Sequence, residues 1–423
     1  MNTRDVANTI ALPIALFSVI APSATFLSPY FTTTTRWVGV TLLFGTVILN
    51  RDWLRNSWRS YGTIPIVAYL AWTLMTGFWS AVPQLTIMKG IAAVLSLTAL
   101  YHGGIIWARS RPLFNAFDFI LPVFLVVLVG SIAGLQDPDA YDSGRRQTMY
   151  RGLFSHQNTL GVMIAICITW PLWQAYTSRH SPIRTGFWLT FTLLLMYALV
   201  LTHARSAMLM AASTCLGAIQ ATGPRLRSQI LSCIGAVLLC VAIISPSTLT
   251  DAVYKTIYKW DDNNVLSSRA DPWRKSQIGA EAGGLTGLGF GVSLGYDTFA
   301  GGVTAIGYGR EKGNSQLAIA EELGLIGLVL YAAIILSIGR TVLEVYRRAR
   351  SREQRALAGL LGGTLAGLVA QSCLEGWWTS PGSVEFAFFW VIAGVMSGQR
   401  LTLTEATGTK TRSRHASGRL VPT

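Results

Sequence analysis

Residues 323–339 read LGLIGLVLYAAIILSIG and carry no charged side chain, and Arg340 follows them directly. An α-helix rises about 1.5 Å per residue, so a span of roughly 20 apolar residues crosses the hydrocarbon layer of a membrane. Apolar runs of similar length recur along the chain as far as residue 398. The stretch therefore predicts one of many membrane crossings.

The composition supports a membrane protein and argues against a nucleic-acid-binding one. Of the 423 residues, 51% are hydrophobic and only 13% are charged, whereas an ordinary soluble domain carries about 25% charged residues. The net charge of +14 suits the basic cytoplasmic loops of a membrane protein, so we expect no nucleic-acid partner. The five cysteines fall in apolar runs without the spacing of a zinc site or a disulfide framework, and we expect no metal and no cofactor.

The apolar runs predict an all-α polytopic membrane protein with about twelve transmembrane helices and both termini in the cytoplasm. Arginines such as Arg51 and Arg109 follow the even-numbered helices, as expected for cytoplasmic loops. The predicted transmembrane domain covers residues 1–399 and includes a long extracytoplasmic loop, 246–313. Residues 400–423 predict a disordered, basic cytoplasmic tail. The predicted helices cover residues 8–27, 37–50, 62–79, 88–107, 114–135, 159–176, 186–203, 206–222, 229–246, 315–339, 357–376 and 383–398.

Three arginines on the predicted outer side, Arg151, Arg205 and Arg269, are not explained by this topology. Arg205 lies in LTHARSA (201–207), where two predicted helices meet with almost no loop. An arginine near membrane depth is costly and faces a cavity or a partner, and its planar fork suits phosphate. We interpret Arg205 as a candidate ligand of an anionic group, with an interfacial anchor as the alternative.

The segment 151–161, RGLFSHQNTLG, opens the sixth predicted helix and presents His156 and Asn158 at the outer interface. A helix N-terminus favours anions. Ser155 or Asn158 can also serve as the helix cap, and a histidine at a helix start is more often a structural hydrogen-bonding group than a base. The segment is therefore a candidate site with a structural alternative.

The segment 313–327, GNSQLAIAEELGLIG, leads into the tenth predicted helix. Glu321 and Glu322 point about 100° apart on a helix, so we expect at least one carboxylate to face a polar interior. The glycine run 283–291, GGLTGLGFG, lacks the βα unit of a nucleotide fingerprint and suggests a flexible turn.

Together, these segments resemble the O-antigen ligase and Wzy-type polymerase superfamily over roughly residues 60–400. The order of the motifs carries the resemblance. The family's histidine before the asparagine is Gly313 in this chain, which favours the polymerase branch. The matching stretches are 152–158 (GLFSHQN), 204–205 (AR), 269–273 (RADPW), 287–291 (GLGFG), 314–317 (NSQL) and 322–327 (ELGLIG).

The resemblance implies a GT-C-like, metal-independent glycosyltransferase in the bacterial inner membrane. It implies polymerisation of undecaprenyl-pyrophosphate-linked oligosaccharide repeat units into an exopolysaccharide or O-antigen-type polymer on the outer face. Membrane lipid, chain-length regulators and export proteins are the other partners that it suggests. A ligase that transfers glycan to lipid A core or protein, and a flippase for the lipid-linked oligosaccharide, are the alternatives.

The resemblance also suggests roles for single residues. Arg205 and Arg269 match the family's two pyrophosphate-binding arginines, and Arg151 is a third candidate. The base that activates the acceptor hydroxyl is left open among four residues, and three residues are candidates for contacts to the glycan or acceptor. The candidate bases are Glu322, Glu321, His156 and Glu311, and the candidate glycan contacts are Asn158, Trp273 and Asn314.

Overall fold

The computed structural model describes residues 3–50, 58–143, 148–221, 267–293 and 312–417. Within these residues the chain is helical apart from turns and one short antiparallel hairpin of β1 (Tyr141–Ser143) and β2 (Thr148–Tyr150). The α-helices are α1 (Thr3–Ile20), α2 (Thr33–Leu49), α4 (Thr63–Met75), α5 (Pro83–Ser110), α6 (Leu121–Ala133), α7 (Gln157–Cys167), α8 (Thr169–Thr177), α9 (Pro182–Leu201), α10 (Arg205–Ala221), α13 (Ser267–Gly283), α14 (Ser315–Arg348), α15 (Arg352–Ser372) and α16 (Val384–Ser417).

Each predicted helix that falls within the described residues is present. The predicted helix 159–176 consists of α7 and α8, which meet at Ile168. The predicted helix 114–135 is α6, preceded by short 3-10 turns. The predicted helix 229–246 lies outside the described residues.

Five helical spans in the described residues are long and apolar enough to cross a membrane: α5, α7 with α8, α9, α14 and the first part of α16. Helix α9 exposes one apolar face through Leu189, Leu193, Tyr197 and Val200, a spacing that keeps them on one side of the helix. The apolar part of α16, by contrast, is buried almost throughout. These lengths and this exposed apolar face are those expected of a polytopic membrane protein.

Glycines allow the central helices to pack at backbone contact. A Cβ atom on Gly394 of α16 would lie 2.0 Å from the carbonyl oxygen of Tyr101 in α5. Similarly, a Cβ atom on Gly217 of α10 would lie 2.3 Å from the carbonyl oxygen of Gly359 in α15. Small residues at such crossings are typical of helix packing in membranes.

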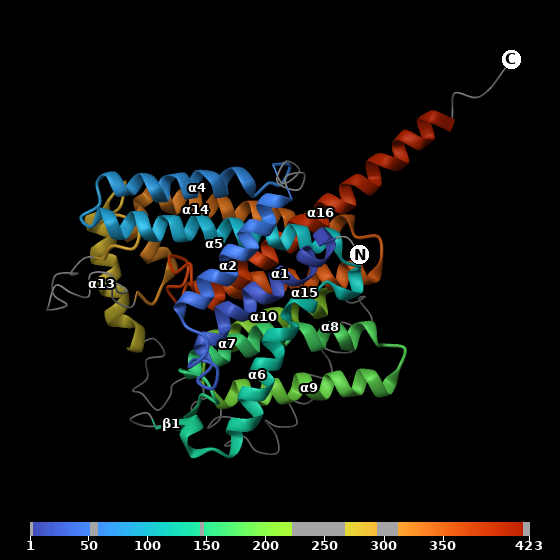
Figure 1. Cartoon of the computed structure of the whole chain (residues 1–423), viewed down its shortest axis with the longest axis horizontal. Helices are drawn as coiled ribbons and strands as arrows, with labels where there is room; N and C mark the ends of the chain where they lie inside the picture. Colours follow the sequence, from blue (N-terminus) through green and yellow to red (C-terminus); the bar gives the residue numbers. More distant parts are fainter. Residues whose placement is uncertain (1–2, 51–57, 144–147, 222–266, 294–311, 418–423) are drawn as a thin grey trace, which may run out of the picture.

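Helix α13 lies within the predicted long outer loop, 246–313. It lies across one end of the bundle, at an angle to the other helices (Figure 1). Gly279 and Gly283 bring it against α14, since a Cβ atom on Gly283 would lie 2.7 Å from the carbonyl oxygen of Glu321. The helix is polar, and its stability comes from this packing rather than from an apolar run.

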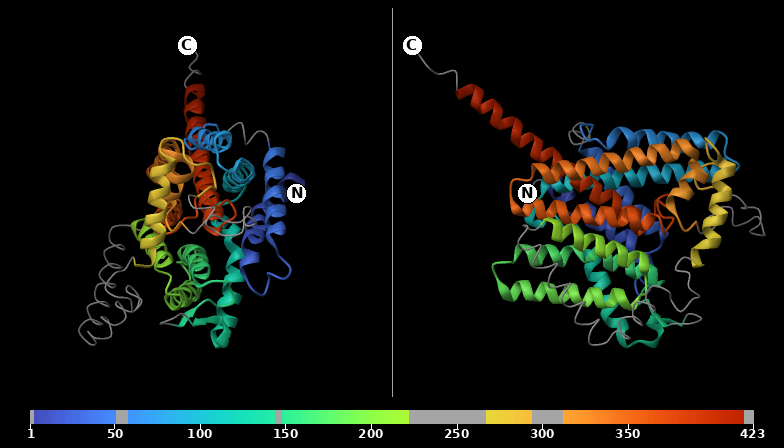
Figure 2. Two further views of the ribbon diagram at one scale, coloured as in Figure 1. Left: turned by 90° about the vertical axis from the view of Figure 1, so that its left-hand side faces the viewer. Right: turned by 180° about the vertical axis from the view of Figure 1, so that it is seen from behind.

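The last helix, α16, is longer than the predicted helix 383–398. Helix α16 continues past Gln399 to Ser417 and projects from the end of the bundle opposite α13 (Figure 2). Arg400 explains the continuation, because its side chain is largely buried and holds the helix to its neighbours. It donates to the carboxylate of Glu344 (Nε–Oε2, 2.6 Å) and to the carbonyl of Arg59 (3.0 Å).

Candidate functional site

Helix α14 is kinked at Gly324, where φ is 69° and ψ is −168°. Backbone groups next to the kink lose their partners within the helix and form hydrogen bonds with the glycine run 283–291 instead. Leu325 donates to the carbonyl of Gly284 (3.1 Å), and Gly289 donates to the carbonyl of Glu322 (3.0 Å). The glycine run is therefore a segment paired with the kink, and not the independent turn that the sequence suggested.

Glycine is required on both sides of this pairing. A Cβ atom on Gly287, which has a φ of 80°, would lie 2.3 Å from the carbonyl oxygen of Glu322. A Cβ atom on Gly324 would lie 2.3 Å from the carbonyl oxygen of Leu285. Positive φ and the close backbone approach both exclude other residues.

The kink holds two adjacent carboxylates, Glu321 and Glu322, inside the protein. Both side chains are buried, as the helical spacing required of at least one. The ammonium group of Lys312 forms an ion pair with Glu322 and lies 3.4 Å from Oε2 of Glu321. Glu322 also accepts hydrogen bonds from Thr379 (Oγ1–Oε1, 3.1 Å) and from the backbone N–H of Gly291 (2.5 Å).

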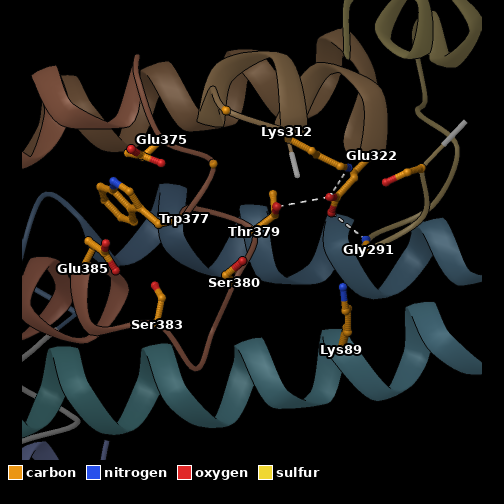
Figure 3. A pocket seen from close by; sticks show the side chains of 13 residues that line it. Lys89, Gly291, Lys312, Glu322, Glu375, Trp377, Thr379, Ser380, Ser383 and Glu385 are labelled. Carbon is orange, nitrogen blue, oxygen red and sulfur yellow. Dashed lines mark hydrogen bonds and ion pairs between the residues drawn. The ribbon is translucent and has the colours of Figure 1, made fainter. Parts of the chain in front are cut away.

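Glu322 forms one wall of a cavity of about 390 Å³ (Figure 3). Helix α5 contributes Lys89, which points toward Glu322. The segment between α15 and α16 forms the far wall, so three parts of the chain that are distant in sequence meet here. The lining residues are Lys89, Gly291, Ser293, Lys312, Gly313, Glu322, Glu375, Gly376, Trp377, Thr379, Ser380, Ser383 and Glu385.

Helix α13 is fastened to this cavity through two of the predicted site residues. Arg269 forms an ion pair with Glu375, which lines the cavity. Trp273 donates from Nε1 to the carbonyl of Gly313 (2.7 Å). The indole of Trp273 thus binds Gly313, which directly precedes Asn314, the cap of α14.

Arg205 begins α10 after a tight turn in which His203 has a φ of 51°. Helix α7 packs closely on this turn, because a Cβ atom on Gly161 would lie 2.6 Å from that of Ala204. Arg205 and Arg269 are close enough for their positive charges to repel each other. The structure therefore brings together two half-buried arginines from α10 and α13.

The other predicted site residues have structural contacts. His156 caps α7, with Nδ1 accepting from the N–H of Asn158 (3.1 Å). Arg151 donates to the carbonyl of Asp139 through Nε (3.2 Å) and Nη2 (3.0 Å).

Asn314 caps α14 through its Oδ1 atom, which accepts from the N–H of Leu317 (2.8 Å). Its Nδ2 atom donates to the carbonyl of Cys373 (2.8 Å). Glu311, the remaining candidate base, lies outside the described residues.

Several lining residues were not among the predicted candidates. Lys89 and Glu385 sit near the ends of predicted membrane helices, and an ionisable side chain in such a helix is a signal for a polar site. Lys312 lies outside the predicted helices, and Glu375 lies at the end of the predicted helix 357–376 but after the end of α15. Only the three-dimensional structure shows that they contact Glu322 and Arg269.

No protein-family model matches this chain, and no curated protein is similar to it at a significant level.

Proposed function

We propose that the protein polymerises oligosaccharide repeat units carried on undecaprenyl pyrophosphate, on the outer face of the bacterial inner membrane. The observation that carries this proposal is that Arg269 forms an ion pair with Glu375, which lines a polar cavity, and lies within electrostatic reach of Arg205. The same proposal includes about twelve transmembrane helices in a GT-C-like arrangement, with both termini in the cytoplasm.

The chemistry explains why paired arginines suit this reaction. The acceptor hydroxyl gives its proton to a base of the protein, its oxygen forms a bond to the anomeric carbon of the donor, and the bond from that carbon to the pyrophosphate breaks. The bonding electrons remain on the pyrophosphate oxygen, whose negative charge grows. Fixed cations aimed at this charge lower the barrier, and guanidinium groups bind phosphate oxygens in pairs.

The repulsion between Arg205 and Arg269 also supports an anionic ligand. Holding two like charges together costs free energy, and a pyrophosphate bound between them offsets this cost. In the absence of a ligand, the ion pair with Glu375 offsets part of this free-energy cost by neutralising Arg269. In this proposal the donor pyrophosphate binds to Arg205 and Arg269, whose positive charges are already in position before it arrives.

The test is elongation by the purified full chain in liposomes that contain a lipid-linked oligosaccharide. Arg205→Ala and Arg269→Ala should each reduce elongation by about 100-fold or more, as removal of one group that stabilises transition-state charge commonly does. Arg274→Ala is the matched control, because Arg274 is an exposed arginine on the same helix as Arg269.

The products separate the proposal from its alternatives. A polymerase gives a ladder of lengthened lipid-linked glycan, whereas a ligase gives single transfers to lipid A core or protein. A flippase moves the intact lipid-linked unit across the bilayer without lengthening it. Wild-type elongation by Arg205→Ala and Arg269→Ala would contradict the assignment of the pyrophosphate site.

A further inference from the structure

The part of the cavity away from Glu322 has a composition of its own. Figure 3 shows Trp377 between the carboxylates of Glu375 and Glu385, with Ser383 nearby. These residues come from the segment between α15 and α16 and from the first turn of α16. At the proposed pyrophosphate site, Glu375 serves only as the partner of Arg269, so this wall of the cavity has no assigned ligand.

Two buried donors that line the cavity have no partner among the residues that the structure describes. They are the indole Nε1 of Trp377 and the hydroxyl of Ser293. Trp377 is only 4% exposed and Ser293 only 3% exposed. Buried polar groups are rarely left without a hydrogen bond, so these two donors indicate a polar occupant of the cavity.

The other polar groups of this wall determine which occupant fits. The carboxyl oxygens of Glu375 and Glu385 accept hydrogen bonds, and the hydroxyls of Ser380 and Ser383 both donate and accept. An anionic ligand would meet two carboxylates here. A ligand that is uncharged and carries several hydroxyls satisfies the donors and the acceptors together.

The size of the cavity agrees with this chemistry. Its volume of about 390 Å³ falls in the range of sites for small molecules, about 300–1,000 Å³. It lies beside Arg269, which ion-pairs with Glu375, so an occupant would sit next to the proposed pyrophosphate site.

We infer that Glu375, Trp377, Ser383 and Glu385 form a subsite that binds an uncharged pyranose residue, which we call the sugar subsite. Ser293, which follows the segment that contacts Glu322 and Lys312, supplies a donor from the opposite wall of the cavity. The role of the sugar subsite as the acceptor end of the reaction rests on the proposed function. The binding of a sugar to it does not, because binding can be measured without turnover.

Saturation-transfer NMR on the purified full chain in detergent tests the inference. The probes are methyl β-D-glucopyranoside, methyl α-D-mannopyranoside and methyl N-acetyl-β-D-glucosaminide, with methyl β-D-glucuronide as the anionic comparison. We expect transfer to at least one neutral glycoside and weaker binding of the glucuronide. Trp377→Phe keeps an aromatic ring but removes the indole N–H, and should weaken binding of that glycoside by about tenfold.

Ser293→Ala should weaken binding in the same direction, and Glu385→Gln serves as a further variant if Trp377→Phe does not fold. Trp58→Phe is the matched control, because Trp58 is an exposed tryptophan and should leave binding unchanged. Absence of transfer to every neutral glycoside, stronger binding of the glucuronide, or unchanged affinity in Trp377→Phe and Ser293→Ala would each overturn the sugar subsite.

The outcomes also separate this inference from the proposed function. If the protein binds the glycoside through Trp377 but does not lengthen the lipid-linked glycan, the sugar subsite is supported and the polymerase proposal is excluded. If the wild type lengthens the lipid-linked glycan but Trp377→Phe binds the glycoside as tightly as the wild type does, only the sugar subsite is excluded.

Discussion

The ammonium group of Lys312 contacts the carboxylate of Glu322 in the interior of the protein, and both side chains are almost completely buried. The same ammonium lies 3.4 Å from a carboxylate oxygen of Glu321. One lysine therefore serves two adjacent carboxylates of α14. The contact links the start of α14 to the kink at Gly324 and so fixes one wall of the cavity.

Lys312→Met should strongly destabilise the protein, because it leaves two buried carboxylates without this cation. Removing one partner of a buried ion pair costs about 3–5 kcal/mol. Thermal unfolding of the full chain in detergent measures the effect. Lys275→Met, an exposed lysine on α13, is the control, and adding Glu322→Gln to Lys312→Met should restore part of the loss. Equal unfolding midpoints for Lys312→Met and Lys275→Met would show that the ion pair is not required.

Gly324→Ala should also destabilise the protein, because alanine at a φ of 69° is strained and its Cβ atom would lie 2.3 Å from the carbonyl oxygen of Leu285. We expect a loss of at least about 2 kcal/mol from the backbone conformation and the contact together. Gly339→Ala in the same helix is the matched control, since nothing lies within 4 Å of its Cβ position.

At Gly339, alanine should be neutral or stabilise the helix by up to about 1 kcal/mol. The difference between the two unfolding midpoints isolates the kink from general effects of glycine replacement. If both variants unfold alike, the pairing of α14 with the glycine run does not contribute to stability.

The positions of the helices were predictable, and the kink and α13 were not. Helix positions follow from apolar length, which is a local property of the sequence. Gly324 lies inside a predicted helix, between Leu323 and Leu325, and the break there depends on hydrogen bonds with the distant glycine run. Helix α13 has no apolar run, contains Pro272, and is held by contacts with α14.

Site residues were predictable from the sequence where a charged residue lies in an apolar run. They were not predictable where their role depends on contacts with residues distant in the sequence. Glu321, Glu322 and Arg205 were found because charges in membrane helices require a polar environment. The partners Lys312 and Glu375 lie in connecting segments, where charged residues are common. Their roles follow from the pairing of the glycine run with α14 and of α13 with the α15–α16 connection.

The ion pair between Arg179 and Glu353, at the start of α15, should make stability depend weakly on pH. The hydrogen bond from Arg179 lowers the pKa of Glu353 to about 2, whereas the unfolded chain has a pKa near ~4.3. The pair therefore contributes stability above about pH 4.3, which is lost as the pH falls toward about 2. Because both side chains are partly exposed, the contribution should be below about 1 kcal/mol.

Arg179→Ala tests this dependence through the unfolding midpoint in detergent as a function of pH. The variant should unfold at a slightly lower temperature than the wild type at neutral pH, and the difference should shrink in acid. Arg184→Ala, at an exposed arginine in the first turn of α9, is the control. A difference that is constant over the whole pH range would assign the effect of Arg179 to packing on Tyr176 and not to Glu353.

Within the proposed function, we expect Glu385 to be the cavity carboxylate that takes the proton of an acceptor hydroxyl. The oxygens of Glu322 already accept from Lys312, Thr379 and Gly291, a geometry that suits a positioning residue. Glu385 is half-buried in the first turn of α16 and faces the sugar subsite. General-base catalysis contributes about 10²–10⁴-fold, so Glu385→Gln should lower kcat for elongation by about 100-fold or more.

The KM for the donor should stay the same in Glu385→Gln, because the pyrophosphate arginines are untouched. His156→Ala should retain elongation within severalfold of the wild type, since its Nδ1 atom caps α7. Glu322→Gln should show its effect mainly as a lower unfolding midpoint. If Glu385→Gln elongates normally and His156→Ala does not, the imidazole is the base and α7, beside Arg205, supplies the catalytic group.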